Sequence, residues 1–349
     1  MGESINLKKM KKVLLTGSEG FIGGYLVKEL IKKGYYVVGI DNLSKYGKII
    51  RNHSESKNYE FIEGDVKDKD LLKKAMQDCE FLIAGAAMIG GISYFHEFEY
   101  DLLSENEKII STTTDVAIDC FRLNKLKRVV FLSSSMVFES TSVFPTKESD
   151  IKNSPAPFSS YGFQKLAVEY FAKAANSQYG LEYSIARPFN AVGIGEVKTG
   201  NDKELSKTSA NLALSHVVPD LILKTLEDAE SVEILGSGKQ IRHYTYGEDL
   251  AEGIVTLLEH PKAKNTDFNL STSESTSVIE LAQLIWKKIR KNDQYNFLFK
   301  DPFKFDVQKR VPSTMKAKKL LGFEATTSLD SMLDIVIPWI INAKKQGLY

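Results

Sequence analysis

Apolar residues occur along the chain in two alternating patterns, short continuous runs and longer segments of helical spacing. The first run, Lys12–Thr16, is bounded by glycine and predicts a buried strand. Phe21, Leu26 and Leu30 then recur at helical spacing up to Gly34, which predicts a helix. Further strands are predicted at 36–41, 61–65, 81–87 and 128–132. Repeated strand and helix units of this kind build a parallel sheet with helices on both faces and right-handed crossovers.

A glycine turn separates the first predicted strand from the first predicted helix. Gly17 permits a tight turn, Gly20 lets the backbone approach a pyrophosphate, and Gly23 lets the helix pack against the strand. The helix N-terminus then faces the phosphates. The second strand ends in Asp41, close to the distance at which an acid takes the adenosine ribose hydroxyls of a dinucleotide. An acid there repels a 2′-phosphate, so the pattern favours NAD over NADP.

A second group of polar residues follows far downstream. Tyrosine has a reference pKa near ~10, so it becomes a base at neutral pH only when a nearby cation lowers its pKa. Lys165 follows Tyr161 by one helical turn, lies on the same helix face and can supply that charge. The strand at 128–132 ends in three serines, residues 133–135, whose hydroxyls can polarise an alcohol or a carbonyl.

These motifs, in this order, resemble the extended short-chain dehydrogenase/reductase family, and within it the nucleotide-sugar epimerases and dehydratases. The resemblance runs from Lys12 to about Trp339 and covers nearly the whole chain. It includes the glycine turn, Gly64-Asp65-Val66, the serine strand, Tyr161 with Lys165, Arg187-Pro188-Phe189-Asn190, Gly236-Ser237-Gly238-Lys239-Gln240-Ile241-Arg242 and Lys316-Ala317-Lys318-Lys319-Leu320-Leu321-Gly322-Phe323.

The resemblance implies an α/β fold in two parts. Residues 1–192 are expected to form a Rossmann domain, a doubly wound parallel sheet that binds NAD. Residues 193–349 are expected to form mainly a smaller, interleaved substrate-binding lobe, with later segments returning to the sheet. Residues 196–209 are polar and predict a mobile loop before a helix that begins at Pro219. The expected cofactor contacts are Gly17, Gly20, Phe21, Ile22, Asp41, Asn42, Asp65, Val66, Ala84, Ala86, Tyr161, Lys165 and Pro188.

The resemblance implies which reaction the residues after the serine strand can support. Aligning Val137-Phe138 with the family's Val-Tyr pair places Ser134 at the catalytic hydroxyl, beside Tyr161 and Lys165. Ser135 and Met136 then stand where the family's 4,6-dehydratases have Asp and Glu, and the family's 3,5-epimerases have Cys at the Met136 position. A thioether has no proton to move. Met136 therefore counts against dehydration and against epimerisation at C3 or C5.

Two segments favour another branch of the same family. The loop at 86–92, which contains Gly90 and Gly91, resembles that of GDP-mannose 3,5-epimerases and GDP-fucose synthases. The segment at 215–219 resembles one in the fucose synthases whose histidine is an acid/base, so His216 is expected either to be catalytic or to contact the nucleotide diphosphate. The expected substrate contacts are Gly90, Gly91, Ser135, Met136, Asn190, His216, Val217, Arg242 and Arg310.

We therefore expect an NAD-dependent nucleotide-sugar epimerase that acts at C4 through a transient 4-keto sugar. The alternatives are a nucleotide-sugar 4-dehydrogenase or ketoreductase, a GDP-sugar 3,5-epimerase and, in a different class, a non-catalytic NAD-binding protein. The resemblance also implies a homodimer. Its surface is predicted on the tyrosine helix, at Ala167, Val168, Phe171 and Ala172, and on the preceding helix at 112–121.

Composition and charge limit which partners and which cellular compartment are expected. The formal net charge of +1 gives no electrostatic reason to expect nucleic acid or an anionic membrane as a partner. No apolar segment approaches the ~20 residues that a bilayer requires, and no signal peptide precedes Val13, so a cytoplasmic protein is expected. Cys79 and Cys120 lack zinc spacing and are interpreted as reduced, and no metal site is expected.

Overall fold

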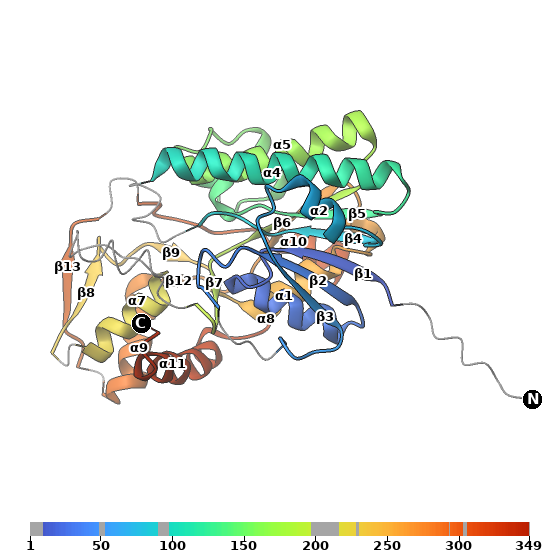
Figure 1. Cartoon of the computed structure of the whole chain (residues 1–349). Coiled ribbons are helices and arrows are strands. Elements are labelled where there is room, and N and C mark those ends of the chain that lie inside the picture. The colour runs from blue at the N-terminus through green and yellow to red at the C-terminus, as the bar shows by residue number, and fades with distance from the viewer. Residues whose placement is uncertain are drawn as a thin grey trace, which may run out of the picture.

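The computed structural model describes residues 10–48, 53–89, 98–196, 216–227, 230–292, 294–302 and 306–348. Its centre is a seven-stranded sheet in the order β11-β6-β5-β4-β1-β2-β3, in which all neighbouring strands are parallel (Figure 1). The strands are β1 (Lys12–Thr16), β2 (Tyr36–Asp41), β3 (Tyr59–Glu63), β4 (Phe81–Ala84), β5 (Arg128–Leu132), β6 (Tyr183–Pro188) and β11 (Thr266–Leu270). The strand order reverses between β1 and β4, which confirms the predicted doubly wound sheet.

Helices cover both faces of this sheet. One face carries α1 (Phe21–Lys32) and α8 (Gly247–Thr256), and the other carries α2 (Lys69–Ala75), α4 (Glu99–Arg122) and α5 (Ser160–Tyr179). Along β1, Val13 and Leu15 join the core on the α1 side, whereas Leu14 joins the core beneath α4 and α5. Because both faces are buried, the strands are continuous apolar runs rather than alternating ones.

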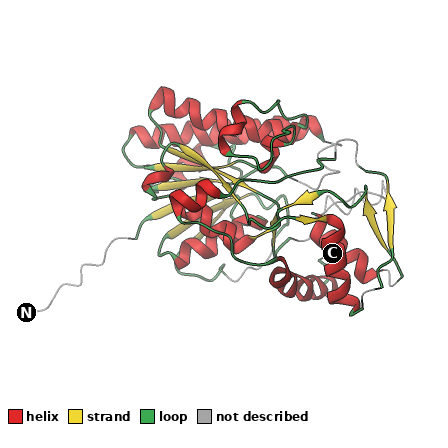
Figure 2. Cartoon of the chain, turned by 180° about the vertical axis from the view of Figure 1, so that it is seen from behind, coloured by secondary structure: helices red, strands yellow, loops and turns green. Residues whose placement is uncertain are grey.

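A smaller lobe lies at one end of the sheet, where Figure 2 shows its helices and short strands gathered together. It contains α7 (Val217–Glu227), α9 (Val278–Arg290), α11 (Leu329–Lys345) and the parallel pair β8 (Val232–Leu235) and β13 (Phe297–Lys300). The remaining elements are β7 (Ala191–Val192) paired with β10 (Thr245–Tyr246), β9 (Ile241–Arg242) paired with β12 (Thr276–Ser277), α10 (Met315–Leu321), and the 3-10 turns η1 (Ser135–Phe138), η2 (Glu148–Lys152) and η3 (Pro261–Ala263).

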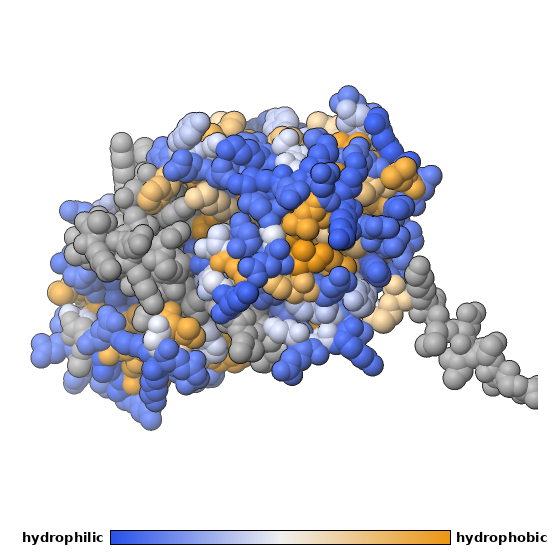
Figure 3. All heavy atoms as spheres, in the orientation of Figure 1, coloured by the Kyte–Doolittle hydropathy of each residue, from blue (hydrophilic) through white to orange (hydrophobic). Residues whose placement is uncertain are grey.

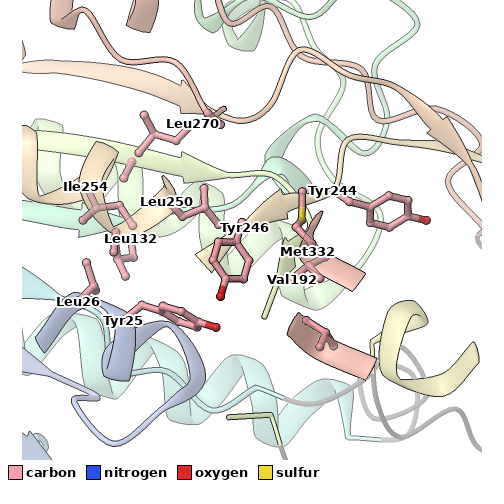
Figure 4. Packing of buried hydrophobic residues seen from close by; sticks show 14 of the residues in the cluster. Tyr25, Leu26, Leu132, Val192, Tyr244, Tyr246, Leu250, Ile254, Leu270 and Met332 are labelled. Carbon is pink, nitrogen blue, oxygen red and sulfur yellow. The ribbon is translucent and has the colours of Figure 1, made fainter. Parts of the chain in front are cut away.

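The lobe and the sheet are interleaved along the chain. After β9 the chain returns to the sheet, where α8 packs beside α1 and β11 pairs with β6, before α9 continues the lobe. The two parts consequently share apolar contacts. Figure 4 shows Tyr25 and Leu26 of α1 in the same apolar cluster as Tyr246, Leu250 and Met332. One continuous core therefore joins the two parts, and a boundary at residue 192 stays a prediction.

Two predicted element positions are corrected. The third strand spans Tyr59–Glu63 and so begins earlier than the predicted 61–65. Helix α7 begins at Val217, two residues before Pro219. Proline is tolerated in a first helical turn because its missing N–H has no partner there. Of the predicted loop at 196–209, residues 197–209 lie outside the described residues.

The predicted dimer surface is also partly wrong. Val168 and Ala172 point into the core beneath α5, and Thr113, Val116 and Ala117 of α4 are buried as well. The cause is helical periodicity, because the residues of α5 that face the sheet recur four apart. The exposed face of α5 instead carries Phe163 (49% exposed) and Tyr170 (67% exposed).

Polar side chains predominate on the face drawn in Figure 3, with apolar side chains in small groups among them. No helix within the described part of the chain has the length and apolar character needed to span a bilayer.

Candidate active site

A cavity of about 710 Å³ opens where the parallel strands end and the smaller lobe begins. Ligands of open α/β sheets bind at this edge, beside the reversal of strand order. The predicted site residues that line it are Gly17, Gly20, Phe21, Ile22, Asp41, Asn42, Asp65, Val66, Ala86, Ser134, Ser135, Met136, Tyr161, Lys165, Pro188, Asn190, His216, Val217, Arg242 and Arg310.

Three predicted residues are not among them. Ala84 is buried inside β4 and packs in the sheet core, whereas the next two residues, Gly85 and Ala86, reach the cavity wall. Ala84, predicted as a cofactor contact, therefore does not line the cavity, because an in-strand side chain points into the core rather than past the strand end. Gly90 and Gly91 lie outside the described residues.

Two glycines of the turn, Gly17 and Gly23, have no room for a side chain. Gly17 has φ +75°, and a Cβ on it would lie 3.0 Å from the backbone of Ala86. A Cβ on Gly23 would lie 2.1 Å from the carbonyl oxygen of Gly17. Gly20 is the N-cap of α1 and provides no side-chain acceptor for the N–H groups of the first turn. This backbone cradle at a helix N-terminus fits the pyrophosphate of a dinucleotide.

Asp41 is fixed at the end of β2 by two backbone groups. Its Oδ1 accepts the N–H of Leu43 at 2.8 Å, and its Oδ2 accepts the N–H of Glu19, within the glycine turn, at 3.1 Å. A carboxylate oxygen can accept more than one hydrogen bond. The residue is therefore placed to accept from ribose hydroxyls, and its charge opposes a 2′-phosphate.

The predicted catalytic residues converge from two elements. Ser134 follows β5 as the N-cap of η1, and its Oγ accepts the N–H of Met136 at 3.2 Å. Tyr161 stands in the first turn of α5, and its hydroxyl forms a hydrogen bond with Ser134. Lys165 lies one turn further, with Nζ 5.9 Å from the centre of the Tyr161 ring and donating to the carbonyl of Leu132 at 3.1 Å.

Burial shifts the pKa values of this pair in opposite directions. Loss of water raises the pKa of Tyr161, and the hydrogen bond from Ser134 and the charge of Arg310 act against that rise. Loss of water lowers the pKa of Lys165 to about 8. The prediction gave Lys165 as the cation that acts on Tyr161, and Arg310 supplies a second positive charge that lowers its pKa.

Two guanidinium groups, those of Arg242 and Arg310, line the cavity. Arg242 lies 3.5 Å from Asp306, measured between Nη2 and Oδ1, and Nε of Arg310 has no hydrogen-bond partner among the described residues. Burial, followed by the charge of Arg242, lowers the pKa of Arg310 to about 9. Two neighbouring guanidinium groups suit a doubly charged anion such as a diphosphate.

His216 forms an ion pair that the sequence did not reveal. Its Nδ1 lies 2.6 Å from Oε1 of Glu196, which also accepts the backbone N–H of His216 at 3.2 Å. The Glu196 charge raises the pKa of the imidazole, whose side chain is 52% exposed and lines the cavity. Glu196 escaped prediction because a single acid in a polar segment carries no pattern.

Met136 and Asn190 also occupy the predicted wall. Met136 is buried and packs against Tyr161 and Leu102. Asn190 adopts φ 35°, a conformation that asparagine tolerates better than most residues, and its side chain donates to the carbonyl of His243 at 3.3 Å.

Residues 13–271 match the model of the NAD dependent epimerase/dehydratase family. The chain belongs to this family. The match confirms the resemblance drawn from the motifs and the predicted dependence on NAD. The glycine cradle, Asp41 and the buried Lys165 are the features of this chain that fit the cofactor.

Proteins named for different reactions are each similar to 95% of this chain. A putative UDP-glucose 4-epimerase of Methanocaldococcus jannaschii is 28% identical over 95% of this chain and 98% of its own length. UDP-glucuronic acid decarboxylase 1 of Danio rerio is 27% identical over 95% of this chain and 73% of its own length. The crystal structure of a Thermotoga maritima UDP-glucose 4-epimerase with UDP-glucose superposes with a TM-score of 0.78 at 26% identity, covering 95% of this chain and 99% of that one.

Proposed function

We propose that the chain is a nucleotide-sugar epimerase that inverts C4 through a transient 4-keto sugar. The observation that carries this proposal is the meeting of Ser134, Tyr161 and Lys165 in the cavity, with Met136 packed against the tyrosine ring. Removing and returning hydrogen at one alcohol carbon needs this set of groups. Dehydration or epimerisation at C3 or C5 needs a further acid or base, and the thioether of Met136 is neither. The names of several relatives, as 4-epimerases, support the same choice.

The reaction follows from the positions of these groups. Bound NAD supplies the acceptor and donor of the hydride. Tyr161 takes the proton of the sugar hydroxyl and gives it back on the return step, while the Ser134 hydroxyl holds the same oxygen. The positive charges of Lys165 and Arg310 favour the tyrosinate that this step requires.

Inversion also requires the ketone to turn over without leaving the enzyme. Arg242 and Arg310 hold the nucleotide diphosphate at the lobe side of the cavity, as family resemblance and their charge suggest. The sugar is then tethered by one end and free to present either face to the cofactor. Asp41 favours NAD over NADP as that cofactor, because the carboxylate repels a 2′-phosphate.

The experiment is to incubate the purified protein and NAD with UDP-, GDP-, CDP- and dTDP-sugars and to analyse the products by mass spectrometry and NMR. Epimerisation leaves the mass unchanged and inverts C4. Loss of two hydrogens would instead identify a 4-dehydrogenase, and loss of water or carbon dioxide would identify a dehydratase or decarboxylase.

A second candidate, a 3,5-epimerase, rests on the ion pair of His216 with Glu196. An acid/base histidine at this position could remove a proton beside a C4 ketone. The Glu196 charge, however, raises the pKa of the imidazole and so favours the imidazolium, which is an acid rather than a base. Reaction in deuterated water separates the two candidates, since proton removal introduces deuterium at C3 or C5 and hydride transfer at C4 does not.

We further propose that the chain acts as a homodimer. The support is the face of α5 formed by Phe163, Leu166, Tyr170 and Phe171, which leaves two large aromatic side chains exposed. Exposed aromatic clusters of this kind mark protein interfaces.

A further inference from the structure

Glu139 is a buried carboxylate that the proposed reaction does not use. It is 6% exposed and follows η1, the 3-10 turn that begins after Ser134. The backbone N–H of Glu139 donates to the carbonyl of Met136 at 3.1 Å and closes this turn. One short turn therefore carries the Ser134 hydroxyl at its start and the Glu139 carboxylate at its end.

Both carboxylate oxygens of Glu139 bind the start of the tyrosine helix. Oε1 accepts the N–H of Ser159 at 2.7 Å, and Oε2 accepts the hydroxyl of Ser159 at 2.9 Å. Ser159 is itself the N-cap of α5, and its Oγ accepts the N–H of Gly162 at 3.0 Å. A negative charge at a helix N-terminus is also favoured by the helix dipole. Tyr161 lies within this tethered first turn.

The two segments are in direct contact as well as hydrogen-bonded. A Cβ on Gly162 would lie 2.7 Å from Oε1 of Glu139 and 2.9 Å from the carbonyl oxygen of Met136. Only glycine lets the helix backbone approach the turn this closely. The carboxylate and the glycine together set the spacing between η1 and α5.

We propose that Glu139 is a positioning residue that holds the hydroxyl of Tyr161 against that of Ser134. This inference rests on the proposed function, which gives those two hydroxyls their roles. Without the carboxylate, the N–H of Ser159 loses its buried acceptor and the first turn of α5 is no longer tied to η1. Displacements of about 1 Å between reacting groups lower rates by on the order of 10²-fold.

The principal test compares Glu139→Ala with Glu139→Gln. The alanine variant should lower kcat by roughly 10- to 100-fold while KM for the sugar nucleotide and Kd for NAD change less than about threefold. The glutamine variant should recover kcat to within about fivefold, because its carbonyl accepts the Ser159 N–H and its amide can donate to the Ser159 hydroxyl. If Glu139→Ala does not fold, Glu139→Asp, shorter by one methylene, should give an intermediate loss.

The pH profile separates positioning from general stability. The Ser134 hydrogen bond lowers the pKa of Tyr161, so loosening it should raise that pKa and move the acid limb of kcat to higher pH in Glu139→Ala. Glu148→Ala is the matched control, because Glu148 is equally buried and accepts the Asn269 N–H at 2.9 Å, but its carboxylate makes no hydrogen bond to α5 among the described residues. The control should lose thermal stability and keep the wild-type acid limb and a kcat within about threefold.

Three results would overturn the proposal. They are wild-type kcat in Glu139→Ala, no recovery in Glu139→Gln, and equal losses of kcat in Glu139→Ala and Glu148→Ala. Measuring Tyr161→Phe beside them keeps the two inferences distinguishable. If Tyr161→Phe is inactive while Glu139→Ala is fully active, only the positioning role fails; if Tyr161→Phe is fully active, the assignment of the tyrosine itself fails.

Discussion

Tyr161 and Lys165 are buried side by side, and their environment favours the uncharged form of each. The chemistry requires the opposite, a tyrosinate beside a cation. Ser134 and Arg310 therefore favour the tyrosinate, because both lower the pKa of Tyr161 against the effect of burial. The pairing of Tyr161 with Lys165 was predictable from their spacing along one helix. The action of Arg310 was not, because it depends on a contact between segments far apart in sequence.

Replacing Tyr161 with phenylalanine keeps the ring and removes the oxygen that accepts the proton. Turnover should fall by ~10²- to 10⁴-fold, and NAD should remain bound. Steady-state kinetics and calorimetry with NAD measure the two effects. Tyr183→Phe, a buried tyrosine of β6 that does not line the cavity, should keep wild-type turnover. Wild-type turnover in Tyr161→Phe would show that another group is the base.

Lys165→Met should change stability in a pH-dependent way. The folded-state pKa of Lys165, about 8, lies below the ordinary value of 10.5, so the unfolded chain holds the proton more tightly between these values. The wild type should consequently gain stability from this group as pH rises from 8 to 10.5. With NAD removed, the methionine variant should be more stable than the wild type by up to ~3 kcal/mol at pH 7, and the difference should shrink towards pH 10. Calorimetric melts across this range that show a constant difference would contradict the shift.

At the scale of elements, the hydrophobic pattern located β1, α1, β2, β4 and β5 closely, because each is either a continuous buried run or a helix with one apolar face. Element ends were less accurate, as the start of α7 before Pro219 shows. The tether between Glu139 and α5 could not be predicted, since a lone acid after a strand has no periodicity.

Gly23→Ala tests the packing of the glycine turn on α1. The new Cβ would lie 2.1 Å from the carbonyl oxygen of Gly17 and 2.8 Å from that of Ser18, so the turn must shift. We expect NAD affinity to fall at least 10-fold, together with a lower melting temperature. Gly34→Ala, just after the other end of α1, meets no atom within 4 Å and carries only the strain of its φ of +84°. It should cost ~1–2 kcal/mol of stability and leave NAD affinity unchanged. Equal NAD affinity in both variants would contradict the role of the turn.

For the whole molecule, the reversal of strand order and the interleaved lobe place the cavity between cofactor-binding and substrate-binding walls. A parallel sheet was predictable because five of its strands recur as apolar runs, whereas β6 and β11 were not located in the sequence. The residues that close the cavity from the lobe were found largely through family motifs, and Glu196 and Asp306 were missed because they meet their partners only in the folded chain.

The proposed homodimer is a property of the whole molecule. Light scattering at micromolar concentration should give about twice the chain mass of 39.1 kDa. Tyr170→Lys, on the exposed face of α5, should shift the protein towards monomer because it places a charge in an apolar interface. Tyr100→Lys is the control, because it also replaces an exposed aromatic residue by lysine but lies on α4. This variant should dimerise like the wild type if the interface is confined to α5. A monomeric wild type would refute the dimer.

A sugar nucleotide deuterated at C4 tests whether the enzyme inverts C4 by removing and returning one hydride. UDP-glucose is the first choice, or another member of the substrate panel if that one is converted instead. The product should have the inverted C4 configuration and retain deuterium at C4 when the reaction runs in ordinary water. Loss of that deuterium to solvent, or a product with unchanged C4 and inversion at C3 or C5, would contradict it.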